Sequence, residues 1–291
     1  MHFVNAKGIL NGNSGGYGMN IYRGCSHGCI YCDSRSTCYR FSHPFEDIEV
    51  KQNAPALLEK ALWSKQKKCM IMTGSMSDPY MHCEEDLRLT EACLKIIRDY
   101  GFGAAVLTKS DRILRDIDLL AEIEARARCV VMMTLTTMDE NLCSIVEPHV
   151  CTSARRIEVL ERMKERGIPT MVWMTPLLPY INDTEENVTS LLEACVHAGV
   201  KGVVCFGMGL TLREGNREYF YDALDRYFPG LRKTYEERYG NSYEIASPHA
   251  GKLMRRFEEI CEANHLLHTA EACFAYMRQL PKAYEQMRLF E

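Results

Sequence analysis

Three cysteines lie within eight residues near the start of the 291-residue chain, at Cys25, Cys29 and Cys32. Their spacing is Cys-x3-Cys-x2-Cys, and an aromatic residue, Tyr31, precedes the last of them. Three thiolates hold an iron–sulfur cubane and leave its fourth iron without a protein ligand, and this open iron can bind a substrate or a cofactor. The motif therefore predicts an iron–sulfur centre with an open iron.

Two other interpretations of the three cysteines stay open at this point. Thiolates also suit zinc, with His27 as a fourth ligand, which would make the protein a metal-structural one. His27 lies between two of the cysteines, however, so reaching the same ion would strain the loop. A disulfide with one spare thiol is the second alternative. The spacing favours the cluster, because structural zinc usually takes two separated pairs of ligands.

The composition is typical of a globular protein. Hydrophobic residues make up 46% of the chain and charged residues 25%, which is enough for one large α/β domain or two small ones. The formal net charge of −4 supplies no global basic field that would attract nucleic acid. The fourteen cysteines, the lack of a signal-peptide pattern and the lack of an apolar run of about 18 residues predict a cytoplasmic protein with no membrane contact.

Short apolar runs alternate with amphipathic segments through most of the chain. The runs are continuous, as in strands that are buried on both faces of a parallel sheet. Strands are expected near residues 17–22, 68–73, 103–108, 129–135, 169–174 and 202–206. Helices are expected at residues 54–66, 84–99, 111–126, 153–166 and 184–198. This order predicts a right-handed α/β fold, and we favour a partial barrel over a flat doubly wound sheet.

The strand pattern stops after about residue 230. Residues 231–240 and 250–288 are expected to be helical, and residues 243–249 are expected to form a loop. We therefore expect two parts, a core at residues 1–230 and a helical C-terminal extension at residues 231–291 that packs on it. One apolar stripe of the extension contains Leu253, Phe257, Ile260 and Cys261.

Polar residues follow the predicted strands at the edge where such folds bind ligands. Ser77 follows the second strand, Lys109 follows the third, and Thr134 lies in the fourth. Together with the cysteine loop, they can surround a small cofactor that has a carboxylate, an amine and a ribose. Each also has a structural interpretation, as a turn residue, a solvated lysine and a strand residue with a bonded hydroxyl. Surface ion pairs are expected among Glu147, Arg155 and Arg156.

The cysteine motif resembles the signature of the radical S-adenosylmethionine (SAM) enzymes. The longer segment at residues 22–35 resembles, more specifically, the branch typified by spore photoproduct lyase and its many uncharacterised relatives. The chain resembles these relatives rather than the lyase itself, over roughly residues 20–230. Further matching segments lie at residues 77–80, 108–110, 115–120, 147–148 and 178–183.

This resemblance implies a partial (β/α)6 barrel of the TIM type and a 4Fe–4S cluster on Cys25, Cys29 and Cys32. It implies that SAM binds the open iron through its amino and carboxylate groups. One electron then cleaves SAM to methionine and a 5′-deoxyadenosyl radical, which abstracts hydrogen from a substrate that the sequence does not identify. An electron donor such as flavodoxin or ferredoxin is the implied partner.

The resemblance also implies roles for four residues. By position in the family motifs, Ser77 contacts the amino group of SAM, Lys109 its carboxylate and Thr134 its ribose, while Tyr31 lies near the adenine. The charge of Lys109 agrees with this role, because an ammonium group is a natural partner for a carboxylate.

Ser75 departs from the pattern of the lyase. Spore photoproduct lyase has a hydrogen-donating cysteine two positions before the serine of its Ser-Asp pair, and that position is Ser75 here. A hydroxyl is a far poorer hydrogen-atom donor than a thiol, so we do not expect thymine-dimer repair by that route. A DNA-repair lyase with nucleic acid as substrate is kept as the alternative function. Other candidate hydrogen donors are Cys83, Cys205, Tyr80 and Tyr180.

A basic strip near the C-terminus bears on that alternative. We interpret it as a solvated helix face rather than as a nucleic-acid site. Its residues are Arg213, Arg217, Arg232, Lys233, Lys252, Arg255 and Arg256.

Overall fold

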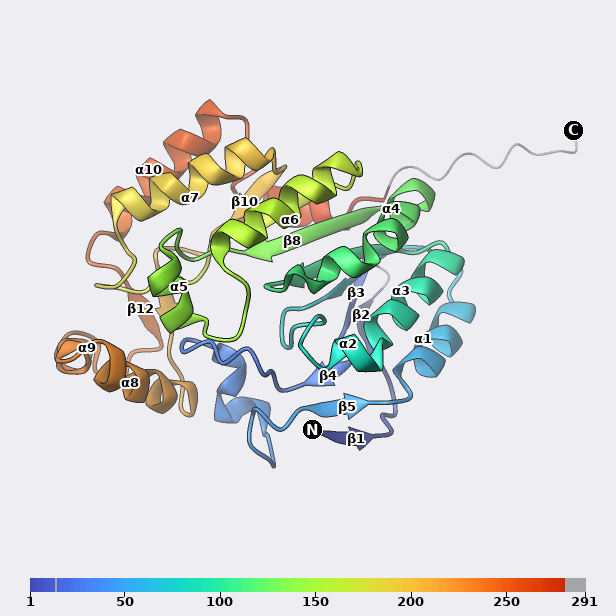
Figure 1. Ribbon diagram of the computed structural model, residues 1–291, viewed down its shortest axis with the longest axis horizontal. Coiled ribbons are helices and arrows are strands. Elements are labelled where there is room, and N and C mark those ends of the chain that lie inside the picture. The colour runs from blue at the N-terminus through green and yellow to red at the C-terminus, as the bar shows by residue number, and fades with distance from the viewer. Residues whose placement is uncertain (14, 281–291) are drawn as a thin grey trace, which may run out of the picture.

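A computed structural model describes residues 1–13 and 15–280 of the chain. Its central sheet has the strand order β10-β9-β8-β7-β6-β3-β2, in which all strands from β3 to β10 run parallel and β2 pairs antiparallel at the edge. Figure 1 shows helices along the outer side of this curved sheet. The predicted partial (β/α)6 barrel is therefore confirmed.

The strands of the central sheet lie close to the predicted positions. Every residue of β7 and β8 is buried, which explains why their sequences are apolar without alternation. The predicted strand near residues 17–22 is divided, because the chain leaves this sheet after β3. The strands are β2 (Leu10–Asn13), β3 (Gly16–Met19), β6 (Met70–Thr73), β7 (Gly103–Thr108), β8 (Cys129–Thr134), β9 (Thr170–Trp173) and β10 (Gly202–Val204).

Helices follow the strands of the barrel, and two of the predicted helices, at residues 84–99 and 111–126, differ from expectation. The segment predicted as one helix at residues 84–99 is broken at Arg88, which has φ 50°. The carboxylate of Glu84 accepts a hydrogen bond of 3.0 Å from the N–H of Thr90, so it caps the second piece. The helices are α1 (Ala54–Trp63), α2 (Glu84–Leu87), α3 (Leu89–Asp99), α4 (Ile117–Arg126), α5 (Glu140–Val146), α6 (Ser153–Glu165) and α7 (Glu185–Ala198). Residues 111–116 form a 3-10 helix, η3 (Asp111–Asp116), rather than the start of α4.

A small second sheet lies at the N-terminal side of the barrel and leads into the cysteine loop. It contains β1 (His2–Val4), β5 (Glu49–Lys51) and β4 (Tyr22–Arg23), with β5 in the middle. Figure 1 shows it beneath the barrel, next to the two short 3-10 helices η1 (Asp33–Arg35) and η2 (Thr37–Tyr39) that follow the cysteines. The sequence analysis contained no strand at β1 or β5.

The C-terminal part is mostly helical, as predicted, but it also contributes a strand. Residues 243–249 were expected to form a loop, and β12 (Glu244–Ala246) within them pairs antiparallel with β11 (Gly209–Thr211). The expected helix at residues 250–288 is two helices, and residues 281–288 lie outside the described part of the chain. The helices are α8 (Asn216–Tyr227), α9 (Leu231–Tyr239), α10 (Ala250–Ala263) and α11 (Ala270–Arg278).

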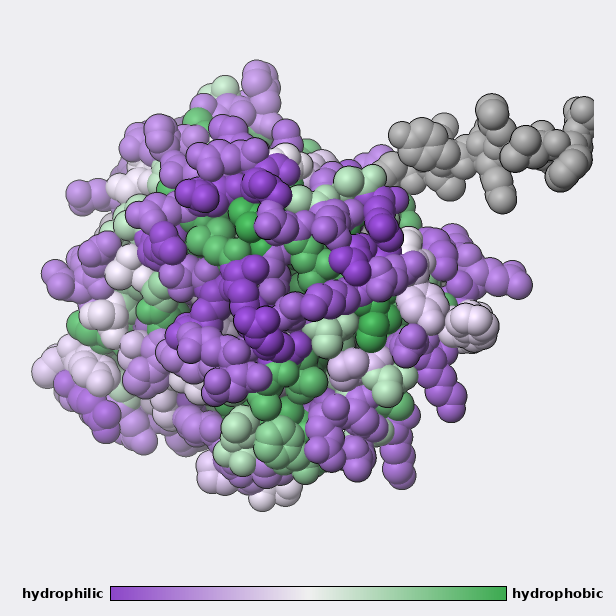
Figure 2. Space-filling view, turned by 45° about the vertical axis from the view of Figure 1, so that its right-hand side comes forward, coloured by the Kyte–Doolittle hydropathy of each residue, from purple (hydrophilic) through white to green (hydrophobic). Residues whose placement is uncertain are grey.

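The apolar stripe of α10 faces the barrel. Leu253, Phe257 and Cys261 are buried, Ile260 is half-buried, and α10 packs against α7. The division of the chain at residue 230 stays a prediction, although the β11–β12 ladder crosses it. The outer surface is mostly hydrophilic with smaller hydrophobic patches on the face shown in Figure 2. None of the helices in residues 1–13 and 15–280 has the length and apolar character needed to cross a membrane.

Candidate functional site

The three cysteines lie in the loop between β4 and η1. Cys29 is buried, while Cys25 and Cys32 are partly exposed. All fourteen cysteines of the chain are free thiols, so the disulfide alternative is wrong. Gly28 has φ +70°, and a Cβ added there would lie 3.1 Å from the His149 ring, so the tight turn between the first two cysteines requires glycine.

Backbone hydrogen bonds hold this loop from both sides. The N–H of Cys25 donates to the carbonyl oxygen of Phe45 at 3.2 Å. The hydroxyl of Ser77 donates to the carbonyl oxygen of Gly24 at 2.5 Å. The predicted turn after β6 therefore fixes the position of the first cysteine.

The three thiols of the cysteine loop are not drawn together as the ligands of a single zinc ion would be. Tetrahedral zinc would draw its thiolates to roughly 3.8 Å from one another. In the described residues, one group of three ligand atoms lies within 4.8 Å of one another, and it does not include the cysteines. A cubane separates its thiolates more widely because each binds a different iron. Ser26 Oγ and His27 Nε2 are buried in this loop without a hydrogen-bond partner, which suits a loop that encloses a bound group.

Tyr31 belongs to a buried group that we call the Tyr31 cluster, formed by Tyr31, Glu147 and Arg156. The Tyr31 hydroxyl donates to the Glu147 carboxylate, and Arg156 Nη1 lies 2.5 Å from the other oxygen. The side chains of Glu147 and Arg156 are both 0% exposed. The expectation of surface ion pairs is therefore wrong for these two residues and applies only to Arg155, which contacts Asp111 at 2.9 Å.

The charges of the Tyr31 cluster affect the pKa of Lys109, which in turn affects the pKa of Cys29 in the cysteine loop. Burial alone would raise the pKa of the Glu147 carboxyl. The positive charges of Arg156 and Lys109 outweigh burial and hold this pKa below its ordinary value. Burial lowers the pKa of Lys109, but the negative charges of Cys29 and Glu147 outweigh it, so the net pKa rises and the ammonium stays charged. Burial also raises the pKa of the Cys29 thiol, and Lys109 opposes that rise. Lys109 is therefore a positive charge beside a thiolate site.

Asp78 ties together the ends of β6 and β7. Its carboxylate accepts hydrogen bonds from the Thr108 hydroxyl at 2.7 Å and from the Lys109 N–H at 2.8 Å. His27 Nδ1 is 3.4 Å from the same carboxylate. This arrangement positions Lys109 relative to the cysteine loop.

Two cavities open at this edge of the barrel. The smaller, of about 140 Å³, is lined by Lys109 and Thr134 among others. The larger, of about 700 Å³, is lined by Tyr31 and Cys32. Ser75, the residue where the lyase pattern has a cysteine, lines both cavities.

The predicted SAM contacts are only partly brought together. Lys109 and Thr134 line the same cavity, and the Lys109 ammonium is 5.8 Å from the centre of the Tyr31 ring. Ser77 lines neither of the two cavities, and its hydroxyl is engaged by the Gly24 carbonyl. The contacts of all four residues with SAM stay predictions.

The candidate hydrogen donors lie outside both cavities. Tyr80 is fully buried, and its hydroxyl donates to Asp116 at 2.9 Å. Cys83 and Cys205 line neither space, so the donor role of these three residues stays a prediction. Tyr39, which the sequence analysis missed, lines the larger cavity and donates to Asp33 at 3.1 Å. Its only signal in the sequence is its position shortly after Cys32.

A second buried group, which we call the Tyr22 cluster, lies where β4 enters the cysteine loop and contains Tyr22, Glu84 and Arg115. The Tyr22 hydroxyl donates to Glu84, whose side chain is 0% exposed, and Arg115 Nη2 is 3.1 Å from that carboxylate. Arg115 also contacts Asp116 at 2.8 Å. The motif segments at residues 77–80 and 115–120 thus serve, at least in part, as the scaffold behind the loop.

Comparison with known proteins agrees with this geometry. The family described as the radical SAM superfamily matches residues 19–192. An uncharacterised protein of Mycobacterium tuberculosis is 32% identical over 232 residues, which span 77% of this chain and 67% of that protein. An uncharacterised protein of Methanocaldococcus jannaschii is 33% identical over 171 residues, or 58% of this chain and 63% of that protein.

Two solved structures share the fold. Spore photoproduct lyase complexed with dinucleoside spore photoproduct has a TM-score of 0.62 and 14% identity, covering 87% of this chain and 76% of the lyase. A radical SAM methyltransferase from Sphaerobacter thermophilus has a TM-score of 0.53 and 17% identity, covering 89% and 67%. The family match includes the cysteine loop and the strands up to β9, and on this basis the chain belongs to the radical SAM superfamily.

Proposed function

We propose that this protein is a radical SAM enzyme that cleaves SAM reductively at a 4Fe–4S cluster and abstracts hydrogen from a substrate. The observation that carries the proposal is that three free thiols, the Lys109 ammonium and two cavities that share Ser75 lie at one edge of the barrel. Superfamily membership supports the cofactors, and a variant of spore photoproduct lyase has been seen with bound AdoMet.

The residues of this chain have distinct tasks in the proposal. Cys25, Cys29 and Cys32 hold the cluster, which when bound supplies one electron to SAM and so yields methionine and a 5′-deoxyadenosyl radical. Lys109 attracts the SAM carboxylate, and a charge-assisted contact of this kind is worth about 1.5–3 kcal/mol. Thr134, on the adjacent strand, offers a hydroxyl to the ribose.

The larger cavity is the proposed place for the substrate. Its lining next to Cys32 is mostly apolar, with Met208, Leu210 and Met254. Such a lining keeps water away from a reactive intermediate. The charged side chains that line it, Asp33 and Glu244, are both acidic. A substrate with an apolar or neutral body is therefore favoured over a polyanion.

The alternative of a DNA-repair lyase gains no support from the charges. Most side chains of the basic strip contact carboxylates or backbone carbonyls of the protein itself. This leaves little net positive field that could attract phosphates. Arg232 contacts Asp225 and Glu236, each at 2.8 Å, and Lys252 contacts Glu185 at 2.5 Å. Further partners are Asp33 for Arg213, Glu237 for Lys233, Glu259 for Arg256, and three backbone carbonyls for Arg217.

Anaerobic reconstitution tests the proposal. We expect about four irons per chain and release of 5′-deoxyadenosine from SAM that depends on dithionite. The Cys29→Ala variant should lose both, whereas the matched control Cys38→Ala, which removes an exposed thiol just outside the motif, should keep both. A protein that holds the full cluster and binds SAM, yet releases no 5′-deoxyadenosine, would contradict the proposal.

A further inference from the structure

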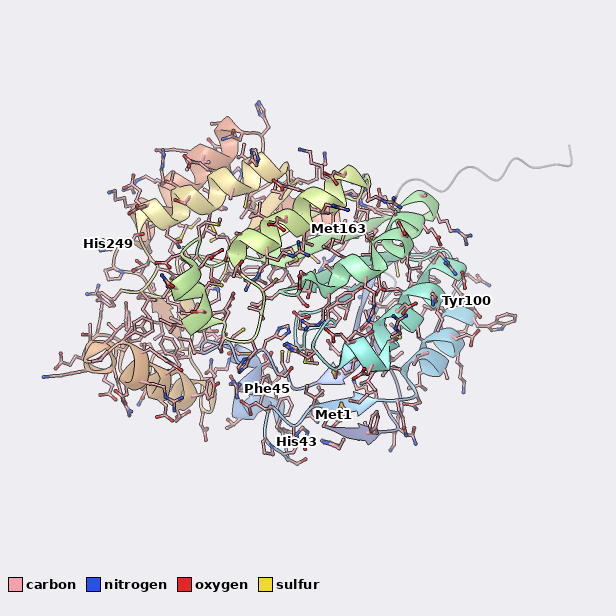
Figure 3. All side chains as sticks on the ribbon, viewed as in Figure 1. Met1, His43, Phe45, Tyr100, Met163 and His249 are labelled. Atoms are coloured by element: carbon pink, nitrogen blue, oxygen red, sulfur yellow. The ribbon has the colours of Figure 1, made fainter. Side chains whose placement is uncertain are left out.

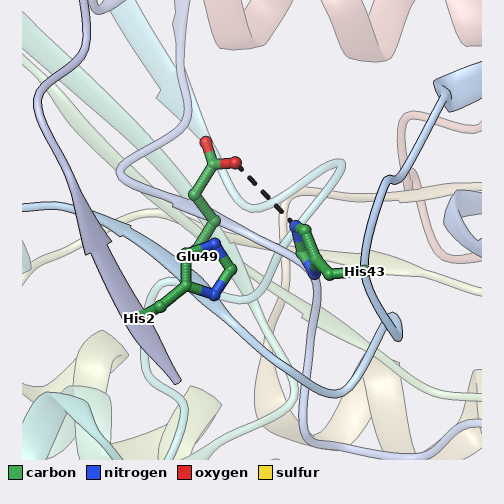
Figure 4. A group of neighbouring side chains, drawn as sticks. All are labelled: His2, His43 and Glu49. Carbon is green, nitrogen blue, oxygen red and sulfur yellow. Dashed lines mark ion pairs between the residues drawn. The ribbon is translucent and has the colours of Figure 1, made fainter.

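A second set of metal-ligand side chains lies away from the cysteines, on the small N-terminal sheet. His2 on β1, Glu49 on β5 and His43 in the loop before β5 each place one ligand atom within 4.8 Å of the others. Figure 4 shows the His43 ring directed at the Glu49 carboxylate, with the His2 ring beside it. We propose that these three side chains bind a divalent metal ion, Zn²⁺, at a site separate from the cysteine loop.

The register of the small sheet creates this site. Along β5, Glu49 is paired with His2 of β1 on one side and with Arg23 of β4 on the other. Residues paired across neighbouring strands project from the same face of a sheet. His43 reaches the same place from the loop, and its ring meets that of His2 edge-on with centroids 4.6 Å apart.

Hydrogen bonds at the other ring nitrogens prepare both histidines as ligands. His43 Nδ1 is 2.9 Å from the Pro44 carbonyl oxygen, and His2 Nδ1 is 3.0 Å from an Asp47 carboxylate oxygen. Because these oxygens only accept, each Nδ1 is the donor, which in a neutral imidazole leaves the lone pair on Nε2. Metal-binding histidines in proteins almost always have this second hydrogen bond to a carbonyl or a carboxylate.

The strongest evidence for a bound cation is the Nε2 atom of His43, which lacks a hydrogen-bond partner among the described residues. This atom is buried, and Glu49 Oε2 is 3.9 Å away, too far for a hydrogen bond. A buried polar atom without a partner is costly, so such atoms are rare in folded proteins. A cation between His43 and Glu49 would satisfy both.

The donor set suits zinc. Two imidazole nitrogens and a carboxylate oxygen at about 2.0–2.2 Å form a familiar three-residue zinc site, with water in the fourth position. Tetrahedral ligands at these distances lie roughly 3.3 Å apart, so the 3.9 Å separation of His43 and Glu49 needs only a small closure. Arg23 Nη1 lies 3.8 Å from the same Glu49 oxygen, while its Nη2 donates to the carbonyls of Tyr39 and Arg40, so a bound ion would share that carboxylate with the guanidinium.

The position of the site, on the small N-terminal sheet, links the proposed ion to the segment that leads into the cysteine loop. Figure 3 labels His43 and Phe45 beside the N-terminal sheet, and the Phe45 carbonyl accepts the hydrogen bond from Cys25. An ion bound by His43 would therefore fix the segment that holds the first cysteine. None of the three proposed ligands lines either of the two cavities.

Zinc stoichiometry tests the site in the full chain with its iron–sulfur cluster reconstituted. The protein is treated with a chelator, titrated with Zn²⁺, passed through a desalting column and analysed for metals. We expect about one zinc per chain for the native protein and for the control His197→Gln, in which the replaced side chain is 83% exposed on α7. We expect none for His43→Gln or Glu49→Gln.

X-ray absorption at the zinc edge distinguishes this site from zinc on stray thiols. We expect zinc–ligand distances of about 2.0–2.1 Å, whereas a thiolate site gives about 2.3 Å. The inference is overturned if the native protein takes up no zinc, if the sulfur distance dominates, or if Glu49→Gln and His43→Gln retain the full complement. If one variant fails to fold, the other variant and the spectrum of the native protein still decide. Release of 5′-deoxyadenosine plays no part in this test.

Discussion

The Tyr22 cluster and the Tyr31 cluster have the same chemical parts but different surroundings. In each, a tyrosine from the N-terminal segment donates its hydroxyl to a fully buried glutamate that also contacts an arginine. Arg156 is 0% exposed, whereas the Arg115 side chain is 22% exposed and has a second carboxylate, Asp116, beside it. Arg156 is thus enclosed with one carboxylate, whereas Arg115 is in contact with two carboxylates and partly with water.

The two clusters also differ in what lies next to them. Glu147 acts electrostatically on Cys29 and Lys109, at the proposed cofactor site. Glu84 instead caps α3 through the Thr90 N–H. The same group of side chains can therefore serve as scaffold or as part of the charge balance of a site, depending only on its neighbours.

The largest expected effect separates the two arginines. Arg156→Met leaves Glu147 buried without its counter-charge, which should cost about 3–5 kcal/mol in free energy of unfolding. Arg115→Met should cost less, about 2 kcal/mol, since Arg115 is partly exposed and Glu84 keeps its hydrogen bonds from Tyr22 and Thr90. Urea unfolding of both variants under anaerobic conditions measures the difference. Equal losses would mean that the burial of the arginine does not distinguish the clusters.

The two tyrosines should differ in function more than in stability. Tyr31→Phe and Tyr22→Phe each remove a hydroxyl donor from a buried carboxylate and should each cost about 1.5–3 kcal/mol. Only Tyr31 also lines the larger cavity. We therefore expect Tyr31→Phe to lower the rate of 5′-deoxyadenosine release per cluster, while Tyr22→Phe leaves that rate unchanged once the iron content is equal. An equal fall in both rates would refute the distinction.

A smaller effect is expected in the pH dependence of stability, through Glu147. The folded-state pKa of Glu147 is held below its unfolded value, so its contribution to stability is present above about pH 4.5 and is lost as the pH falls through the folded pKa. We expect Glu147→Gln to make the unfolding free energy of the apoprotein less dependent on pH below about pH 4.5. Urea titrations at a series of pH values measure this slope, and a variant with the same slope as the native protein would speak against it.

The smallest effect belongs to the neighbour of Arg156. Arg155 forms an exposed pair with Asp111, so Arg155→Met should change the unfolding free energy by no more than about 0.5 kcal/mol. It is the matched control for Arg156→Met because it removes the same charge one residue earlier. A loss comparable to that of Arg156→Met would show that net charge, and not burial, sets the cost.

Much of the fold followed from local patterns. The apolar runs of β7 and β8 are continuous because both strands are buried over their whole length, and such a run is visible in residues near one another in sequence. The small N-terminal sheet was missed because its strands have two or three residues each, too few to show a period.

The sequence by itself determined the cysteine motif, the alternation of strands and helices in the barrel, and the strand ends that carry Lys109 and Thr134. Only the tertiary structure decided that Arg156 is buried with Glu147 while Arg155 is exposed, because neighbours on a helix point about 100° apart and burial depends on what that face meets. It likewise brought His2, His43 and Glu49 together. Contacts between distant segments have no local signature, since they arise only when the strands pair and the loops close over them.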